Sequence, residues 1–292
     1  MDRRGFLSGM AGLLLAGCGR NSSALSIGSK NFTEQLVLGE LLAQFVGPFT
    51  ALPIERRFYL SGTYICHQAL LAGRIDMYVE YTGTALVAIL KEPPSSDNAA
   101  VFNTVRDRYA SKFGLEVLPS LGFDNTFAMV MRGADARHLR LKTLSDAAAV
   151  SSQLRLGVGY EFLERADGYK GLVSKYGLKF KEAPRVMDLG LLYRALENNQ
   201  IDMAAGSNTD GLIAALDLVV LEDDRHYFPP YDAVPIARRE TLARHPEVAA
   251  ALHRLSGRIS AEEMRRMNYA VDGEKKDAET VVKEFLAAKS LS

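Results

Sequence analysis

Residues 81–84, Tyr-Thr-Gly-Thr, combine an aromatic ring, two hydroxyls and a flexible glycine. The residues before them place apolar side chains at Ile75, Met77 and Val79, and this two-residue period predicts a strand that ends near Tyr81. In open α/β sheets, ligands bind just beyond the carboxyl ends of the strands. We therefore expect this segment to lie at a small-molecule site, with the ring and the hydroxyls available to the ligand.

The sequence that leads into this segment has an internal echo. Residues 69–77 resemble residues 195–203, since both read as a helix end, a polar turn and a strand start, at an offset of 126 residues. A second pair, residues 26–29 and 155–159, stands in the same order. Chance similarity of helix-turn-strand segments is the alternative, but two ordered matches favour two α/β lobes of similar plan. The repeat then places Ser207 opposite Tyr81 at a shared cleft.

Composition and motifs argue for binding and against catalysis. Among 292 residues, 35 basic side chains balance 35 acidic ones, so no basic field for nucleic acid is present. The five histidines show no His-Glu-x-x-His spacing, and neither a Gly-x-Ser-x-Gly elbow nor a phosphate-cradling loop occurs. We predict a protein without catalytic residues, metal or cofactor. Cys66 stands outside any metal-ligand cluster and is expected to be a small core residue.

The amino terminus, residues 1–18, is predicted to be a lipoprotein signal peptide. A short basic region precedes an apolar run at residues 10–16, which is too short to span a bilayer. The run ends in Leu-Ala-Gly-Cys18, which resembles a bacterial lipobox whose cysteine is acylated, with a plain secretory peptide as the alternative. Arg3 and Arg4 resemble a twin-arginine export motif, which leaves the export route open. We expect a lipid-anchored protein of the cell envelope that faces the periplasm, with residues 19–24 as a tether.

Alternating strand and helix patterns predict a mainly parallel sheet in each lobe. Thr33 or Asn31 is expected to cap the first helix, and Arg165 is expected inside a single helix. Two chain crossings near residues 117–124 and 222–232 would form a two-stranded hinge, which is the plan of a clamp that closes on its ligand. The predicted helices cover residues 34–46, 98–113, 161–169 and 187–198; lobe I comprises residues 25–120 and 229–292, and lobe II residues 121–228.

Four motifs follow the order found in one family. They are Ser-Lys-Asn-Phe-Thr-Glu-Gln at 29–35, Tyr-Val-Glu-Tyr-Thr-Gly-Thr at 78–84, Arg-Ala-Asp-Gly-Tyr at 165–169 and Thr-Asp-Gly at 209–211. With them the chain resembles, from residue 25 to about residue 287, the osmoprotectant-binding proteins of ABC importers. The resemblance implies a two-lobed type II periplasmic-binding-protein fold. It also implies that lobe closure captures glycine betaine, choline, carnitine or proline betaine, and that the protein, expected to be a monomer, delivers the ligand to an ABC permease in the inner membrane.

The resemblance also implies the site residues. The family holds a quaternary ammonium in a box of tyrosines and the carboxylate through Lys, Arg and Thr. A quaternary ammonium has no N–H to donate, so aromatic faces suit it, and a carboxylate prefers charge-assisted donors. By this correspondence, Lys30, Thr84 and Arg165 bind the carboxylate, Tyr81 and Tyr231 are walls of the box, Phe127 and Ser207 stand where tyrosines are usual, and Asn125 lies beside Phe127. Serine leaves one wall open, so we expect weak binding of glycine betaine or a preference for a bulkier betaine.

Each of these residues has a structural alternative. Lys30 could be a surface lysine, Tyr81 a core tyrosine, and Arg165 a partner of Glu161 or Asp167 in an ordinary helix ion pair. Thr84 could cap a helix, Tyr231 could pack the hinge, and Asp124, Asn125 and Asp210 could hold loops. For function, the alternatives are the same scaffold binding ergothioneine, another large betaine or an amino acid, an envelope enzyme on a two-lobed scaffold, and the effector domain of a regulator.

Overall fold

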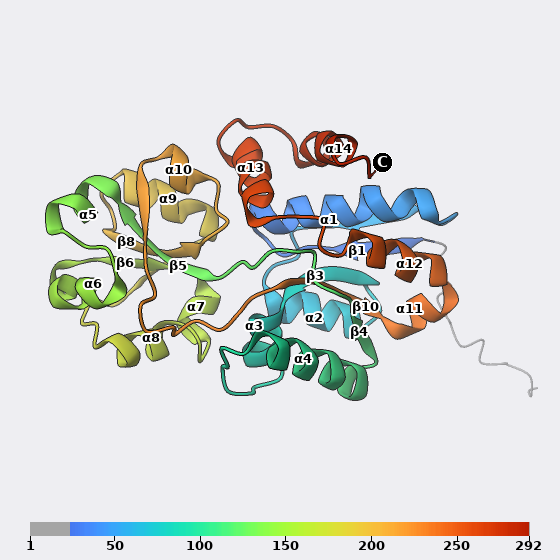
Figure 1. Cartoon of the computed structure of the whole chain (residues 1–292), viewed down its shortest axis with the longest axis horizontal. Helices are drawn as coiled ribbons and strands as arrows, with labels where there is room; N and C mark the ends of the chain where they lie inside the picture. Colours follow the sequence, from blue (N-terminus) through green and yellow to red (C-terminus); the bar gives the residue numbers. More distant parts are fainter. Residues whose placement is uncertain (1–23, 292) are drawn as a thin grey trace, which may run out of the picture.

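The computed structural model describes residues 24–291, which form two α/β lobes, each built on a five-stranded sheet (Figure 1). The sheet of lobe I has the order β2-β1-β3-β10-β4, and that of lobe II the order β7-β6-β8-β5-β9. The strands of lobe I are β1 (Leu25–Gly28), β2 (Ile54–Arg57), β3 (Met77–Tyr81), β4 (Leu115–Val117) and β10 (Ala233–Arg238). Those of lobe II are β5 (Phe127–Arg132), β6 (Leu156–Val158), β7 (Arg185–Val186), β8 (Met203–Ser207) and β9 (Leu218–Leu221).

Both sheets are mixed, so the prediction of mainly parallel sheets was wrong. In lobe I, β10 runs antiparallel to β3 and β4, and in lobe II, β5 runs antiparallel to β8 and β9. The cause is the direction in which the crossing chain enters each sheet. Ala233 pairs with Tyr81, the last residue of β3, and Phe127 pairs with Ser207, the last residue of β8. Each crossing chain therefore enters a sheet at the cleft, where the neighbouring strand ends.

The internal echo is confirmed in the structure. Asp76 accepts a hydrogen bond from the backbone N–H of Ser26 at 2.8 Å, and Asp202 accepts one from that of Arg155 at 2.9 Å. In each lobe an aspartate at a strand start thus fixes the first residues of the neighbouring parallel strand. The two sheets repeat one plan, which places the ends of β3 and β8 at the same cleft.

Helices cover the sheets, and one of them departs from the prediction by more than a residue or two at its ends. The helix predicted at 98–113 is confirmed, whereas the one predicted at 161–169 breaks into α7 and α8, with Arg165 extended between them. The helices of lobe I are α1 (Thr33–Val46), α2 (Thr63–Leu71), α3 (Thr82–Thr84), α4 (Asn98–Phe113), α11 (Arg239–Arg244), α12 (Pro246–Leu255), α13 (Ala261–Asp272) and α14 (Ala278–Ala288). Those of lobe II are α5 (Gly133–Leu139), α6 (Leu144–Val150), α7 (Tyr160–Glu164), α8 (Tyr169–Tyr176), α9 (Leu189–Glu197) and α10 (Leu212–Ala215).

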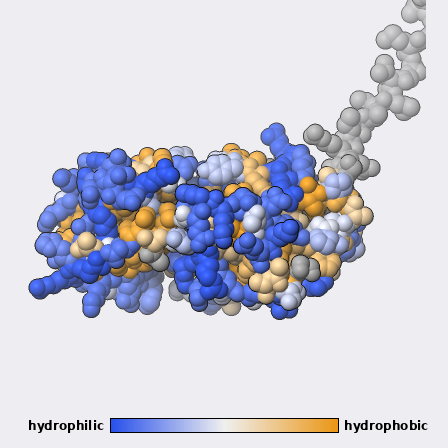
Figure 2. Space-filling view, turned by 90° about the horizontal axis from the view of Figure 1, so that it is seen from above, coloured by the Kyte–Doolittle hydropathy of each residue, from blue (hydrophilic) through white to orange (hydrophobic). Residues whose placement is uncertain are grey.

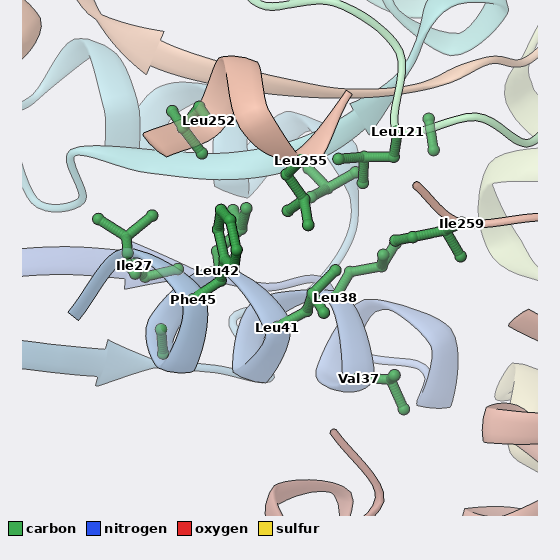
Figure 3. Packing of buried hydrophobic residues seen from close by; sticks show 14 of the residues in the cluster. Ile27, Val37, Leu38, Leu41, Leu42, Phe45, Leu121, Leu252, Leu255 and Ile259 are labelled. Carbon is green, nitrogen blue, oxygen red and sulfur yellow. The ribbon is translucent and has the colours of Figure 1, made fainter. Parts of the chain in front are cut away.

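The core of lobe I is organised around α1. Its stripe of Leu38, Leu41, Leu42 and Phe45 is buried against α12 and the sheet (Figure 3). Each such side chain contributes about 1.5–3 kcal/mol relative to an exposed one. The predicted cap was wrong, since neither Thr33 nor Asn31 caps this helix: Phe32 stands at the N-cap without a side-chain bond. The α1 layer and the layer of α2 and α4 enclose the sheet of lobe I (Figure 1).

Two chain segments cross between the lobes. Asp124 and Asp232 form an antiparallel bridge, and the backbone N–H of Asn125 donates to the carbonyl of Tyr231 at 3.1 Å. The two crossings therefore run side by side next to the cleft, which is the arrangement expected of a two-stranded hinge. The lobe boundaries at residues 120/121 and 228/229 stay a prediction.

One face of the molecule is mostly hydrophilic, with hydrophobic patches on both lobes (Figure 2). Within residues 24–291, no helix is at once long and apolar enough to cross a membrane. Cys66 is buried, as predicted, and burial raises the pKa of its thiol to about 12. Cys18 and the rest of the predicted signal peptide lie outside the described residues.

Candidate ligand-binding cavity

A cavity of about 620 Å³ lies between the lobes. This volume falls within the range of about 300–1,000 Å³ that is usual for small-molecule sites. Side chains from α1, the end of β3, the crossings, the α7–α8 loop and the end of β8 line it. All eight predicted ligand-binding residues are among them: Lys30, Tyr81, Thr84, Asn125, Phe127, Arg165, Ser207 and Tyr231. The structure brings these residues together, and their contacts with a ligand stay a prediction.

Lys30 is a buried residue of this cavity, so the surface-lysine alternative was wrong. Its side chain is 4% exposed, its Nζ forms an ion pair with Glu80, and Nζ lies 4.9 Å from the ring centroid of Tyr81. The Tyr81 hydroxyl donates to Glu34 at 2.7 Å. A lysine ammonium has three donors, and one of them goes to Glu80. Lys30 is therefore held in place and still has hydrogen-bonding capacity for a ligand.

Arg165 lines the cavity and joins the two lobes. Its Nε donates to Asp167 at 2.8 Å and its Nη2 to the other oxygen of that carboxylate, while Nη1 donates to Thr84 of lobe I at 2.9 Å. Arg165 thus forms an ion pair with Asp167, as one of the structural alternatives proposed, but this ion pair lies in a loop and not along a helix. Of the five N–H donors of a guanidinium, these bonds engage three, which leaves two for a ligand carboxylate. Burial lowers the pKa of Arg165, and the bonds to Asp167 outweigh it and raise the pKa.

The aromatic walls already contact the cations of the protein. Phe127 and Tyr231 meet edge to face, with ring centroids 5.4 Å apart. The guanidinium of Arg165 lies 5.0 Å from the centroid of Phe127 and 5.6 Å from that of Tyr231. Phe162, which sequence analysis did not single out, packs on Phe127 at 4.9 Å. The aromatic box and the cationic donors therefore form one contiguous cluster.

The corner at Ser207 is polar. The Ser207 hydroxyl hydrogen-bonds to the side chain of Asn125, and its backbone N–H donates to Oδ2 of Asp210 at 2.8 Å. The Tyr193 hydroxyl also donates to Oδ2 of Asp210. Burial raises the pKa of Asp210 to about 7. The position where an aromatic wall is missing is thus occupied by a hydroxyl, an amide and a carboxyl group.

Glu34 is a cavity residue that sequence analysis missed. It is 2% exposed and accepts hydrogen bonds from Tyr81, from Asn125 and, at 3.0 Å, from Asn268. Burial raises the pKa of Glu34, and the hydrogen bonds from its neighbours only partly offset this shift. A signal was present, since Glu34 stands four residues before Leu38 on the buried stripe of α1.

Similarity to known proteins is high along most of the chain. A family model described as the substrate-binding domain of an ABC-type glycine betaine transport system matches residues 23–288. The carnitine transport binding protein of Listeria monocytogenes is 37% identical over 92% of this chain and 87% of its own. The ergothioneine transport permease/ergothioneine binding protein of Helicobacter pylori is 36% identical over 90% of this chain and 47% of its own. The glycine-betaine-binding protein of Pseudomonas aeruginosa is 33% identical over 94% and 91%.

Solved structures show the same fold. One described as a glycine betaine/carnitine/choline ABC transporter has a TM-score of 0.76 and 35% sequence identity, covering 91% of this chain and 99% of that one. The ligand-free glycine betaine-binding protein YehZ of Escherichia coli has a TM-score of 0.68 over 93% of this chain and 100% of that one. The predicted two-lobed type II binding-protein fold is confirmed by these similarities.

Proposed function

Because the chain belongs to the family of substrate-binding domains of ABC-type glycine betaine transport systems, we propose that it captures a zwitterionic betaine between its lobes and presents it to a permease. The family is one of extracytoplasmic transport binding proteins and not of enzymes, so the enzyme alternative was wrong. In our proposal, Lys30 and Arg165 bind the ligand carboxylate with their remaining donors. The ammonium lies against Tyr81, Phe127 and Tyr231. The convergence of these residues on one interlobe cavity carries the proposal.

We propose further that the preferred ligand is larger than glycine betaine. Ser207 leaves one wall of the box without an aromatic face, and the cavity volume of about 620 Å³ leaves room for a substituent. Relatives that are 37% and 36% identical are named for carnitine and ergothioneine. An amino acid remains an alternative ligand, and the calorimetric panel described next includes proline to test it.

Ser207→Tyr restores the missing face and should change ligand preference. Glycine betaine should bind tighter by about 0.5–2 kcal/mol, or roughly 2- to 30-fold. A bulkier betaine should bind more weakly, because the new ring occupies its space. Isothermal titration of both proteins with glycine betaine, carnitine, ergothioneine and proline measures this. No change for any ligand would mean that Ser207 does not face the bound molecule.

The mature protein is proposed to be a monomer anchored in the membrane by a lipid on Cys18. The lipobox-like tetrapeptide that ends the apolar run supports this, and the paired arginines support export by the twin-arginine route. We also keep the division into lobe I (residues 25–120 and 229–292) and lobe II (residues 121–228). Cys18→Ala should move the protein from the membrane fraction to the soluble fraction. A variant that stays with membranes after a carbonate wash would contradict the lipid anchor.

A further inference from the structure

Asp210 is a cavity carboxylate with one oxygen unused. Both hydrogen bonds that it accepts, from the Ser207 N–H and the Tyr193 hydroxyl, fall on Oδ2. Within residues 24–291, no hydrogen bond reaches Oδ1 and no basic side chain pairs with the group. The side chain is only half-buried, and Oδ1 is not among the buried polar atoms without a partner, so this oxygen is accessible from the cavity. Since Asp210 lines the cavity, its remaining lone pairs are available to a ligand.

The position of Asp210 relative to the aromatic box fixes what such a ligand looks like. Phe127 and Ser207 are direct partners in the β5–β8 ladder, so their Cα atoms lie about 4.5–5.5 Å apart. The Ser207 N–H is bonded to Asp210. Phe127 and Asp210 therefore line the same part of the cavity, on either side of Ser207.

We propose that the corner formed by Ser207 and Asp210 is an acceptor subsite that selects betaines with an N–H or O–H donor on the substituent next to the ammonium. A ring N–H or a hydroxyl donates to Oδ1 of Asp210. Glycine betaine has no such donor and gains nothing from the corner. This inference rests on the proposed betaine binding and adds to it the chemical class of the substituent.

Charged groups around the corner decide how the subsite depends on pH. Tyr193 from α9 donates to Asp210, while Glu34 from α1 and Asp272 from α13 repel its charge. With burial, these effects give Asp210 a pKa of about 7 in the free protein. A donor on the ligand prefers the ionised carboxylate as its acceptor. The affinity for a donor-bearing betaine therefore rises as pH increases through about 7, and it rises more steeply than the affinity for glycine betaine, which has no donor for the carboxylate.

Asp210→Asn tests the subsite. The amide oxygen can still accept from Ser207 and Tyr193, so the loop keeps its bonds, but an NH₂ group replaces the free acceptor. Carnitine, with its hydroxyl, and ergothioneine, with its ring N–H groups, should bind about 5- to 150-fold more weakly. The affinity for glycine betaine should change by less than about 2-fold, because glycine betaine has no donor for this oxygen. Asp188→Asn is the matched control, since it removes a carboxylate at the cavity mouth while an asparagine still caps α9.

Calorimetry at pH 6 and pH 8 with the wild-type protein gives an independent measurement that needs no variant. Affinity for carnitine, whose hydroxyl does not titrate in this range, should be higher at pH 8. Equal losses for glycine betaine and carnitine in Asp210→Asn, or no loss for either, would overturn the subsite. A flat pH profile for carnitine would overturn it as well. If no betaine binds the wild-type protein, the proposed function itself fails and the subsite with it.

Discussion

At the residue scale, each cation of the cavity has an acid of its own. Lys30 pairs with Glu80 and Arg165 with Asp167, and both acids are fully buried. This pairing keeps the charges in place in the absence of ligand and leaves part of their donors free. Arg165 has a second structural role, because it stacks on aromatic rings that are also proposed to receive the ligand ammonium. Its replacement therefore affects both fold and binding.

Arg165→Ala should weaken glycine betaine or carnitine by at least about 100-fold, since losing one partner of a buried charge pair costs about 3–5 kcal/mol. The affinity for choline, a cation without a carboxylate, should fall much less. The companion variant Arg165→Ala with Asp167→Asn removes the charge left unpaired and should melt at a higher temperature than Arg165→Ala alone. Titrations and thermal melts of both variants measure this. Equal losses for choline and carnitine would assign Arg165 to the fold and not to the carboxylate.

The identity of the cavity residues could be predicted from the sequence, but their partners could not. Motif positions were enough to bring Lys30, Tyr81 and Arg165 to one cavity. The acids Glu34 and Asp210, however, acquire their importance from burial, which is a property of the packed lobes. A carboxylate in a sequence is a surface residue far more often than a buried one.

At the element scale, the strand-helix plan followed from residue periodicity, and the strand directions did not. The period of apolar residues in β10 is the same whether the strand is parallel or antiparallel to β3. Direction is set by where the chain re-enters the lobe, and this depends on the crossings. The break between α7 and α8 was hidden for a related reason. Arg165 and Asp167 are both residue types that a helix accepts. In the structure, however, they form a buried ion pair that holds the loop, and residues two apart in sequence do not face each other on a helix.

At the scale of the whole molecule, a side chain of α7 in lobe II caps the N-terminus of α2 in lobe I. The carboxylate of Glu161 accepts a hydrogen bond from the backbone N–H of Thr63 at 2.6 Å, at the first residue of α2. The N-cap of α2 is Gly62, which has no side chain to do this, and a Cβ there would lie 2.1 Å from Oε1 of Glu161. A negative charge at a helix N-terminus is favourable. This contact spans the cleft, so it is made only when the lobes are closed.

Glu161→Ala should therefore shift the molecule toward an open state. A lost N-cap costs about 0.5–2 kcal/mol, so every ligand should bind roughly 2- to 30-fold more weakly, by a similar factor for glycine betaine and for larger betaines. The loss should lie mostly in faster dissociation, because closure follows encounter. Glu164→Ala, an exposed change on the same helix, is the control and should leave binding unaltered.

Small-angle scattering of the free protein gives a second measure of the same contact, since an open clamp has a larger radius of gyration. The Glu161→Ala protein should show that increase, and saturating ligand should reverse it. A glutamine at position 161 can still accept the bond from Thr63 but carries no charge, so it should fall between alanine and wild type. If Glu161→Ala weakens large betaines and spares glycine betaine, Glu161 contacts the ligand directly. The interlobe cap would then not be what holds the lobes closed.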